Sequence, residues 1–200
     1  MAGRRLAAGA LAAGGLGAMA AGWVMVSGPQ FPLGDAGTLP AVQAPAAAGG
    51  RAPASPPQSI RGPGRFKAGI VPVAATADGV LALPEEPDTG GWWALGAAPG
   101  APRGTVLVAG HVDTREGELG TFALLHEFPL GARVVLTGAD GRARAYRVTA
   151  RRTYGQEALP ADLFNRDGPP RLALITCAGR YDHTAGRYLK NLVLYAMPTP

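Results

Sequence analysis

The sequence predicts a mainly β protein whose folded domain is a closed or nearly closed β-barrel. Short apolar runs recur through the second two thirds of the chain, and most are flanked by Gly, Pro or Asp. Helical signals there are limited to a turn or two, and no long amphipathic helix follows residue 60. Short strands without crossover helices favour a barrel over a parallel sheet covered by helices.

The composition divides the chain into three parts. Residues 1–60 are dominated by Ala, Gly and Pro, whereas residues 61–200 carry 13 of the 14 acidic and 16 of the 19 basic residues. A length of about 140 residues is enough for one domain with its own core. We therefore expect a membrane anchor or signal peptide at 1–26, a Pro/Ala/Gly-rich linker at 27–60 and one folded domain at 61–200.

The amino-terminal segment is long enough to cross a membrane. Residues 6–26 carry no charge, and as a helix they would span about 30 Å, the thickness of a hydrocarbon core. Arg4 and Arg5 precede the segment and favour the cytoplasmic side, which would place the domain outside the cell. The sequence A-M-A at 18–20 also fits a signal-peptidase site, so a cleaved signal peptide is the alternative. Both interpretations export the domain, and the length of the apolar stretch favours a single-pass anchor.

The segment from 27 to 59 has the composition of a tether. It contains seven prolines among Ala, Gly and Ser and few large apolar residues. Such a chain stays extended and solvated. We expect a disordered linker that holds the domain away from the membrane surface.

The clearest element of the domain is a β-hairpin. Residues 133–137 and 142–149 are strand-like and flank a turn that contains Asp140 and Gly141, a pair typical of tight hairpins. Similar short runs predict further strands at 66–73, 79–83, 105–109, 172–176 and 189–196. Residues 121–126 and 160–164 predict short helical turns.

The charge pattern gives little support to a polyanionic partner. The net charge of the chain is +5, and basic residues are interspersed with acidic ones. We expect no nucleic-acid partner. One local cluster either faces solvent or faces an anionic polymer or lipid headgroups: Arg142, Arg144, Arg147, Arg151 and Arg152.

Cys177 is the one cysteine, so no intramolecular disulfide can form. It ends the apolar run 172–176, and His111 follows a similar run at 106–109. If these strands are neighbours, thiol and imidazole meet, and the imidazole can activate the thiol and protonate a leaving amine. From composition and spacing alone, a buried inert thiol is the favoured interpretation, and a nucleophile is the alternative. His126 and His183 are expected at the surface.

Two strings resemble the motifs of the sortase family. V-A-G-H-V-D-T at 108–114 resembles the sortase histidine motif, and L-I-T-C at 174–177 resembles the T-x-T-C-type motif, with Leu174 in place of the first threonine. D-T-G-G-W-W at 88–93 and T-A-G-R-Y at 184–188 resemble actinobacterial sortases of classes E and F. The resemblance covers about residues 61–197.

The resemblance implies an eight-stranded barrel and a cysteine transpeptidase. Cys177 would attack an LPxTG-like sorting signal after its threonine, His111 would act as acid and base, and Thr176 would help to position the signal. No metal or cofactor is implied. The implied partners are surface proteins that carry the signal and an amine of the cell wall or of a pilin. The expected location is the cell membrane, with the catalytic domain outside.

The third active-site residue departs from the usual sortase pattern. Many sortases carry an arginine on the strand after the cysteine loop, but the run 189–196 has only Lys190 as a basic residue. We predict Arg187, with Arg180 and Lys190 as alternatives. A guanidinium is preferred because its planar fork binds an oxyanion or a carbonyl through paired hydrogen bonds.

Two other functions fit parts of the sequence. An L,D-transpeptidase also uses an extracellular cysteine, but its compact S-H-G-C-x-R cluster is missing, since His111 lies 66 positions before Cys177. A tethered binding barrel with a metal at Cys177, His111 and His183 would need closely spaced further ligands. Both alternatives rank below the sortase-like transpeptidase.

Overall fold

The computed structural model describes residues 34–39, 54–76, 80–114 and 116–200. The predicted anchor at 1–26 and most of the predicted linker lie outside these residues. In the described ranges no helix has the length and apolar character needed to cross a bilayer.

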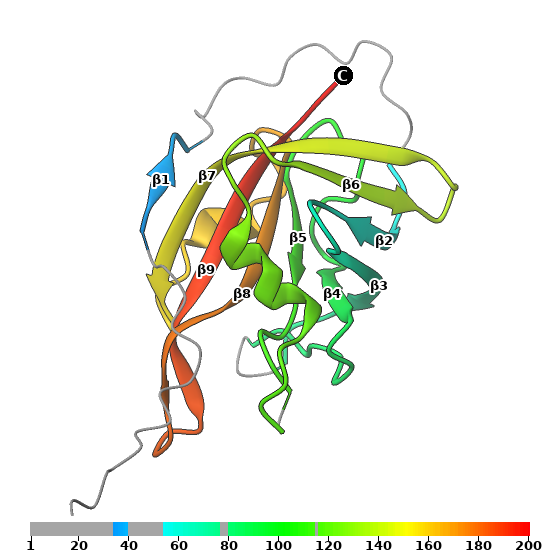
Figure 1. The fold of residues 1–200 in the computed structure, drawn as a ribbon. Helices are drawn as coiled ribbons and strands as arrows, with labels where there is room; N and C mark the ends of the chain where they lie inside the picture. Colours follow the sequence, from blue (N-terminus) through cyan, green and yellow to red (C-terminus); the bar gives the residue numbers. More distant parts are fainter. Residues whose placement is uncertain (1–33, 40–53, 77–79, 115) are drawn as a thin grey trace, which may run out of the picture.

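Eight strands, β2 to β9, close into a barrel (Figure 1). Their order is β7-β6-β2-β3-β4-β5-β8-β9, and β9 pairs again with β7. The β3–β4 and β5–β8 pairs are parallel, whereas the other pairs are antiparallel. The strands are β2 (Pro57–Arg61), β3 (Lys67–Val73), β4 (Thr89–Trp93), β5 (Thr105–Ala109), β6 (Arg133–Gly138), β7 (Ala143–Gly155), β8 (Arg171–Asp182) and β9 (Arg187–Pro198). The predicted mainly β barrel is confirmed.

Alternation along the strands fills the barrel interior. On the β6–β7 hairpin, Val134 and Leu136 point to the same interior cluster as Tyr146 and Val148, while the residues between them are more exposed. This period of two is the pattern expected of a half-buried antiparallel pair. The hairpin is therefore an element that the sequence predicts correctly.

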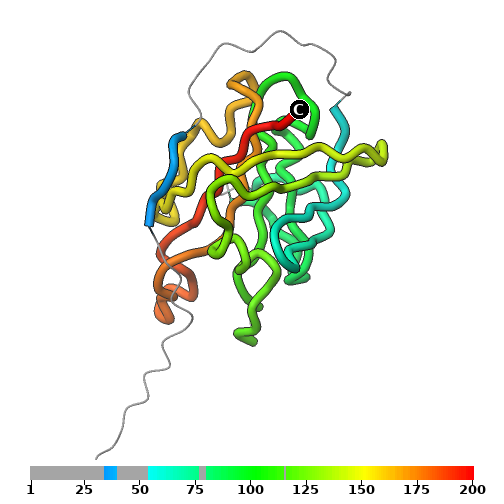
Figure 2. Tube along the Cα trace, turned by 45° about the horizontal axis from the view of Figure 1, so that its top comes forward, coloured from blue at the N-terminus to red at the C-terminus, as the bar shows by residue number. Residues whose placement is uncertain are grey.

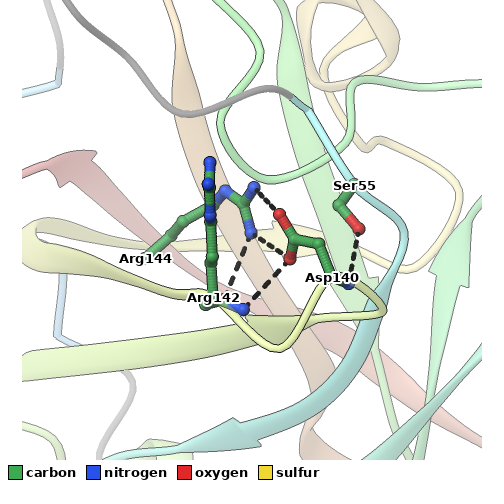
Figure 3. Close-up of polar contacts among 4 residues, drawn as sticks. All are labelled: Ser55, Asp140, Arg142 and Arg144. Carbon is green, nitrogen blue, oxygen red and sulfur yellow. Dashed lines mark hydrogen bonds and ion pairs between the residues drawn. The ribbon is translucent and has the colours of Figure 1, made fainter.

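The turn of this hairpin is fixed by polar contacts (Figure 3). The guanidinium of Arg144 donates to both carboxylate oxygens of Asp140, at 3.1 and 2.7 Å, and the backbone N–H of Arg142 donates to the same carboxylate at 3.1 Å. The backbone N–H of Asp140 donates to Ser55 Oγ at 3.2 Å. The turn thus binds the chain segment that leads into β2.

A second apolar cluster covers the outer face of β5, β8 and β9. Leu107, Ala173 and Tyr195 belong to it, and Leu163 of the short 3₁₀ helix η2 (Ala161–Phe164) packs over them. Both faces of β5 and β8 are therefore buried, which explains why these strands are continuous apolar runs in the sequence. The other 3₁₀ helix, η1 (Thr121–Glu127), packs against the interior cluster.

The structure differs from several predicted elements. The expected strand at 79–83 is reduced to a single bridge between Leu81 and Ala75 in the described part of that segment. Strands β2 and β4 were not predicted, because Pro57 and the Gly90-Gly91 pair interrupt the usual strand signal. β7, β8 and β9 extend beyond their predicted ends, since they continue to pair with one another past the continuous apolar runs.

Part of the predicted linker pairs with the domain as a β-strand. β1 (Ala36–Gly37) pairs with β7, as the blue segment beside β7 shows in Figures 1 and 2. β2 begins at Pro57, four residues before the predicted start of the domain.

The arginine cluster lies mainly on β7 and contacts backbone carbonyls. Arg147 donates to the carbonyl of Gly131, Arg151 to that of Phe128, and Arg152 to those of β1. These guanidinium groups therefore fasten neighbouring loops to β7.

Candidate active site

The register of β5 and β8 aligns the two predicted catalytic residues. The strands are parallel, with Ala109 opposite Ile175 at the end of β5. The pairing continues into the next residue, because the Gly110 N–H donates to the Ile175 carbonyl at 3.1 Å. Extending this register by one further step along each chain would place His111 opposite Cys177, two residues beyond the end of β5. Residues that are side by side in a parallel pair share a face of the sheet.

Thr176 and Gly110 hold this junction together. The buried hydroxyl of Thr176 donates to the Gly110 carbonyl at 2.9 Å. A Cβ on Gly110 would lie 2.2 Å from the ring of Phe122, so only glycine fits where η1 packs against the end of β5. The structure therefore places Thr176 in a structural contact between the two strands that carry His111 and Cys177.

Cys177 is half-buried, and β8 continues past it to Asp182. Its side chain packs against a small cluster formed by Val112, Ala123 and Tyr188. Burial raises the pKa of the Cys177 thiol to about 11, and the negative charge of Asp113 adds to the effect. With a pKa near 11, only about one thiol in ten thousand is ionised at pH 7. Reaction at neutral pH therefore needs a partner that accepts the thiol proton.

Asp113 and Tyr188 connect the loop after β5 to β9. The Tyr188 hydroxyl donates to Asp113 Oδ2 at 2.5 Å. Burial raises the pKa of Tyr188, and its hydrogen bond to Asp113 raises it further, so the phenol stays protonated as the donor. Sequence reasoning gave neither residue a role, although both lie within the strings that resemble sortase motifs.

His126 lies in the core, and its expected surface position was wrong. Its side chain is 2% exposed, and Nε2 lies 3.1 Å from the backbone carbonyl of Cys177. Burial lowers the pKa of His126, which favours a neutral ring that donates from Nε2 to this carbonyl. The signal was available in the sequence, because His126 continues the apolar run of η1 and shares its buried side with Phe122 and Leu125.

Arg187 lies further along the β8–β9 hairpin, which projects from the barrel in orange and red (Figures 1 and 2). It pairs with Asp182, whereas Cys177 pairs with Asn191. Four residues along a strand correspond to roughly 13 Å. The half-exposed guanidinium donates to Glu157 Oε1 at 2.9 Å. Thr176 and Cys177 are thus adjacent on β8, the β5–β8 register predicts His111 near them, and Arg187 lies further along the hairpin in an ion pair with Glu157.

The two alternatives to Arg187 also lie on this hairpin. Lys190 pairs with Ala178, one residue after Cys177, and its stem would contact a Cβ on Gly179 at 3.3 Å. Arg180 is exposed beyond a bulge in β8. His183 is exposed at the end of the hairpin, and its ring contacts Tyr181. No group of three His, Cys, Asp or Glu side chains suited to a metal ion occurs within the described segments.

Comparison with protein families identifies the domain. The family model described as Sortase domain matches residues 67–199, about two thirds of the chain. The chain belongs to the sortase family. Sortases are cysteine transpeptidases, so the predicted family and enzyme class are confirmed. The assignment to class E or F stays a prediction.

Solved sortase structures share the fold of this sortase. Sortase C-1 from Actinomyces oris matches with a TM-score of 0.55 at 17% identity, over 72% of this chain and 75% of that chain. A lid mutant of sortase A from Corynebacterium diphtheriae matches with a TM-score of 0.55 at 19% identity, over 75% and 73% of the two chains. A lid mutant of Streptococcus agalactiae sortase C1 gives 0.53 at 15% identity, over 71% and 68%. A search of curated proteins gave no match.

Proposed function

We propose that this sortase cleaves an LPxTG-like sorting signal after its threonine and transfers the acyl group to an amine. The observation that carries the proposal is the parallel β5–β8 register, because its continuation supports a position for His111 opposite Cys177, the one thiol of the chain. Family membership supports the reaction type. The sorting motif and the accepting amine follow from the resemblance of the sequence motifs.

The first half-reaction forms a thioester. The Cys177 thiol gives its proton to His111, and the sulfur attacks the threonine carbonyl. The tetrahedral intermediate collapses with cleavage of the C–N bond, and His111 gives the proton to the departing amine. The high pKa of Cys177 supports this order, because the free enzyme holds a neutral thiol until substrate and base are in place.

The second half-reaction reverses these proton transfers. The incoming amine attacks the thioester and gives a proton to His111. Cleavage of the bond between the acyl carbon and Sγ releases the Cys177 thiolate, which takes the proton back from His111. The new amide joins the sorting-signal protein to the acceptor, which we propose is an amine of the cell wall or of a pilin.

Arg187 is our proposed cation for the oxyanion of these intermediates. To act there, it must leave Glu157 and turn toward Cys177. Exposed ion pairs of this kind contribute only about 0–1 kcal/mol, so the ion pair is a small obstacle to that movement. Thr176 would act on the signal peptide indirectly, through the backbone junction that its hydroxyl holds.

We further propose that residues 1–26 anchor the enzyme in the membrane as a single span, with the catalytic domain outside the cell. The charge-free stretch at 6–26 and the two arginines before it support this location.

The reaction is tested with the full-length chain in detergent and a panel of sorting-signal peptides with a small amine. We expect mass spectrometry to detect peptide cleavage after threonine and a thioester on Cys177. Cys177→Ala should abolish both, and His111→Ala should lower turnover by at least about a hundredfold. Transpeptidation that survives in Cys177→Ala would overturn the proposal. A shortened chain beginning at residue 61 is unsuitable, because it lacks β1 and most of β2.

The third residue is tested by alanine replacement of Arg187, Arg180 and Lys190. Loss of one oxyanion donor typically lowers kcat by about 10²–10³, and we expect this loss in Arg187→Ala. Glu157→Ala serves as the control, because it removes the ion pair and leaves the guanidinium in place. If Arg187→Ala and Glu157→Ala have similar near-wild-type kcat, the catalytic cation is another residue.

A further inference from the structure

An N-terminal clip, residues 35–37, completes the sheet at one edge of β7. β6 pairs with the first part of β7 and ends its pairing at Arg147. Beyond that point β1 pairs with the free edge, with Gly37 opposite Ala150 and Ala36 opposite Arg151. The clip is therefore an additional strand that belongs in sequence to the predicted linker.

Side-chain hydrogen bonds from both the clip and β7 hold the two segments together. The guanidinium of Arg152 donates to the carbonyl of Ala36 at 2.6 Å and to that of Gly37 at 2.9 Å. The Asp35 carboxylate in turn accepts the backbone N–H of Thr153 at 2.9 Å. The planar fork of an arginine is well suited to bind two neighbouring carbonyls, so the contact favours one register of this segment against β7.

Gly37 makes this site selective for its own segment. Its φ of +73° lies in the left-handed region, and a Cβ there would lie 2.1 Å from the carbonyl oxygen of Thr149. Only glycine avoids both the strain and the clash. Gly34, three residues earlier, is different, because a Cβ at that position has nothing within 4 Å.

The clip ends at the same level of the sheet as the candidate active site. Asp35 contacts Thr153 of β7, Thr153 pairs with Leu192 of β9, and Leu192 pairs with Thr176 of β8. Three strand spacings separate β1 from β8, which is roughly 14 Å. The chain that precedes Asp35 therefore leaves the domain at the end of the barrel that carries Cys177.

We propose that the N-terminal clip keeps the active-site end of the barrel close to the membrane. This inference rests on the membrane anchor of the proposed function. With the clip docked, residues 27–34 alone separate the predicted anchor from the domain, and the disordered linker expected from the composition would give eight residues a root-mean-square span of roughly 16 Å. Without the clip, residues 27–56 would form the connection, and the same relation gives roughly 30 Å.

Docking is tested by amide hydrogen exchange of the full-length chain in detergent. Gly37→Val should release the clip, and the Thr153 amide should then exchange at least about tenfold faster than in wild type, because it loses its acceptor. Gly34→Val adds the same side chain without a contact and should exchange as wild type does. If the Thr153 amide exchanged in Gly37→Val as slowly as in wild type, the proposed docking of the clip would be wrong.

Membrane proximity is tested by energy transfer in phospholipid nanodiscs. A fluorophore on Cys177 serves as donor, and labelled lipid headgroups serve as acceptors. Gly37→Val should move the donor away from the bilayer by roughly 14 Å and lower the transfer, while Gly34→Val should match wild type. Equal transfer in all three chains, with Thr153 deprotected in Gly37→Val, would overturn the inference. A chain that does not enter nanodiscs would contradict the proposed membrane anchor, and the inference would fail with it. The hydrogen-exchange experiment would still show whether the clip forms.

Discussion

At the scale of single residues, the reactivity of Cys177 depends on the groups that face it. His111 follows the neighbouring strand β5, Asp113 and Tyr188 lie on the adjacent loop and strand, and His126 contacts the backbone carbonyl of Cys177. Asp113 raises the pKa of the thiol, while the hydroxyl of Tyr188 donates to the same carboxylate and disperses its charge.

Two substitutions of this pair should therefore have opposite effects. Asp113→Asn removes the negative charge, so the pKa of Cys177 should fall below about 11 and the thiol should be alkylated faster at pH 8. Tyr188→Phe leaves the charge and removes its hydrogen bond, so the pKa should rise and alkylation should slow. The pH dependence of alkylation by iodoacetamide measures both.

The double variant separates electrostatics from packing. If the effect of Tyr188→Phe acts through the carboxylate, it should disappear in the Asp113→Asn background. Slower alkylation in both single variants would instead indicate disturbed packing around Cys177, and the electrostatic explanation would fail.

The catalytic candidates are predictable at this scale, but their supporting contacts are not. His111 and Cys177 each follow an apolar strand and lie in motif-like strings. The hydrogen bond between Asp113 and Tyr188 joins residues 75 positions apart in the chain, and a local sequence pattern cannot predict such a contact. The polarity of His126 predicts a surface position, but the packing of η1 against the interior cluster buries it.

At the scale of elements, η1 supports β8 through the hydrogen bond between His126 and Cys177. Because burial lowers the pKa of His126 below its ordinary 6.5, the unfolded chain binds a proton more readily than the folded one. This histidine thus favours folding above pH 6.5, and its contribution is lost as the pH falls below that value.

His126→Gln should reduce this acid sensitivity. We expect the free energy of unfolding in urea to decrease between pH 7.5 and 5.5 in wild type and to change less in the variant. His183→Gln, at an exposed position, should retain the wild-type decrease. If His126→Gln has the same pH dependence as wild type, the pKa of His126 does not differ between the folded and the unfolded chain, and the explanation is wrong.

The β6–β7 turn provides a second pH-dependent element. The hydrogen bonds from Arg144 lower the pKa of Asp140 to about 2, so the carboxylate stabilises the turn above its unfolded pKa near 3.9 and loses this effect as the pH falls toward 2. Asp140→Asn should lower Tm at pH 7, and the difference from wild type should vanish near pH 2. Asp167→Asn, whose ion pair is longer and exposed, should change Tm little at either pH.

Elements with strong local signals were predicted, and those defined by distant partners were not. The β6–β7 hairpin carries its register in its own turn residues. β2 and β4 carry Pro57 and paired glycines and become strands because neighbours on both sides supply hydrogen bonds. β1 has only two residues, and a Pro/Ala/Gly-rich context gives no indication that Arg152 will bind it.

At the scale of the whole molecule, the two apolar clusters form one cooperative unit because β9 contributes to both. Leu194 faces the interior cluster and Tyr195 the outer one, and both are almost fully buried. Leu194→Ala should cost about 2–5 kcal/mol of stability, and Tyr195→Ala should destabilise to a similar degree. Calorimetry should record a single transition at a lower temperature in each variant, with Lys190→Ala close to wild type. Two separated transitions would contradict one cooperative unit.

The position of β9 also determines when the active site can form. Cys177 lies on β8, which pairs on one side with β5, made early in the chain, and on the other with β9, the last strand. A ribosome releases the chain from its amino terminus, so β9 becomes available after the other strands of the barrel. The nucleophile therefore remains without its complete surroundings until β9 has been made, and the order of the strands delays the thiol's reactivity until the barrel can close around it.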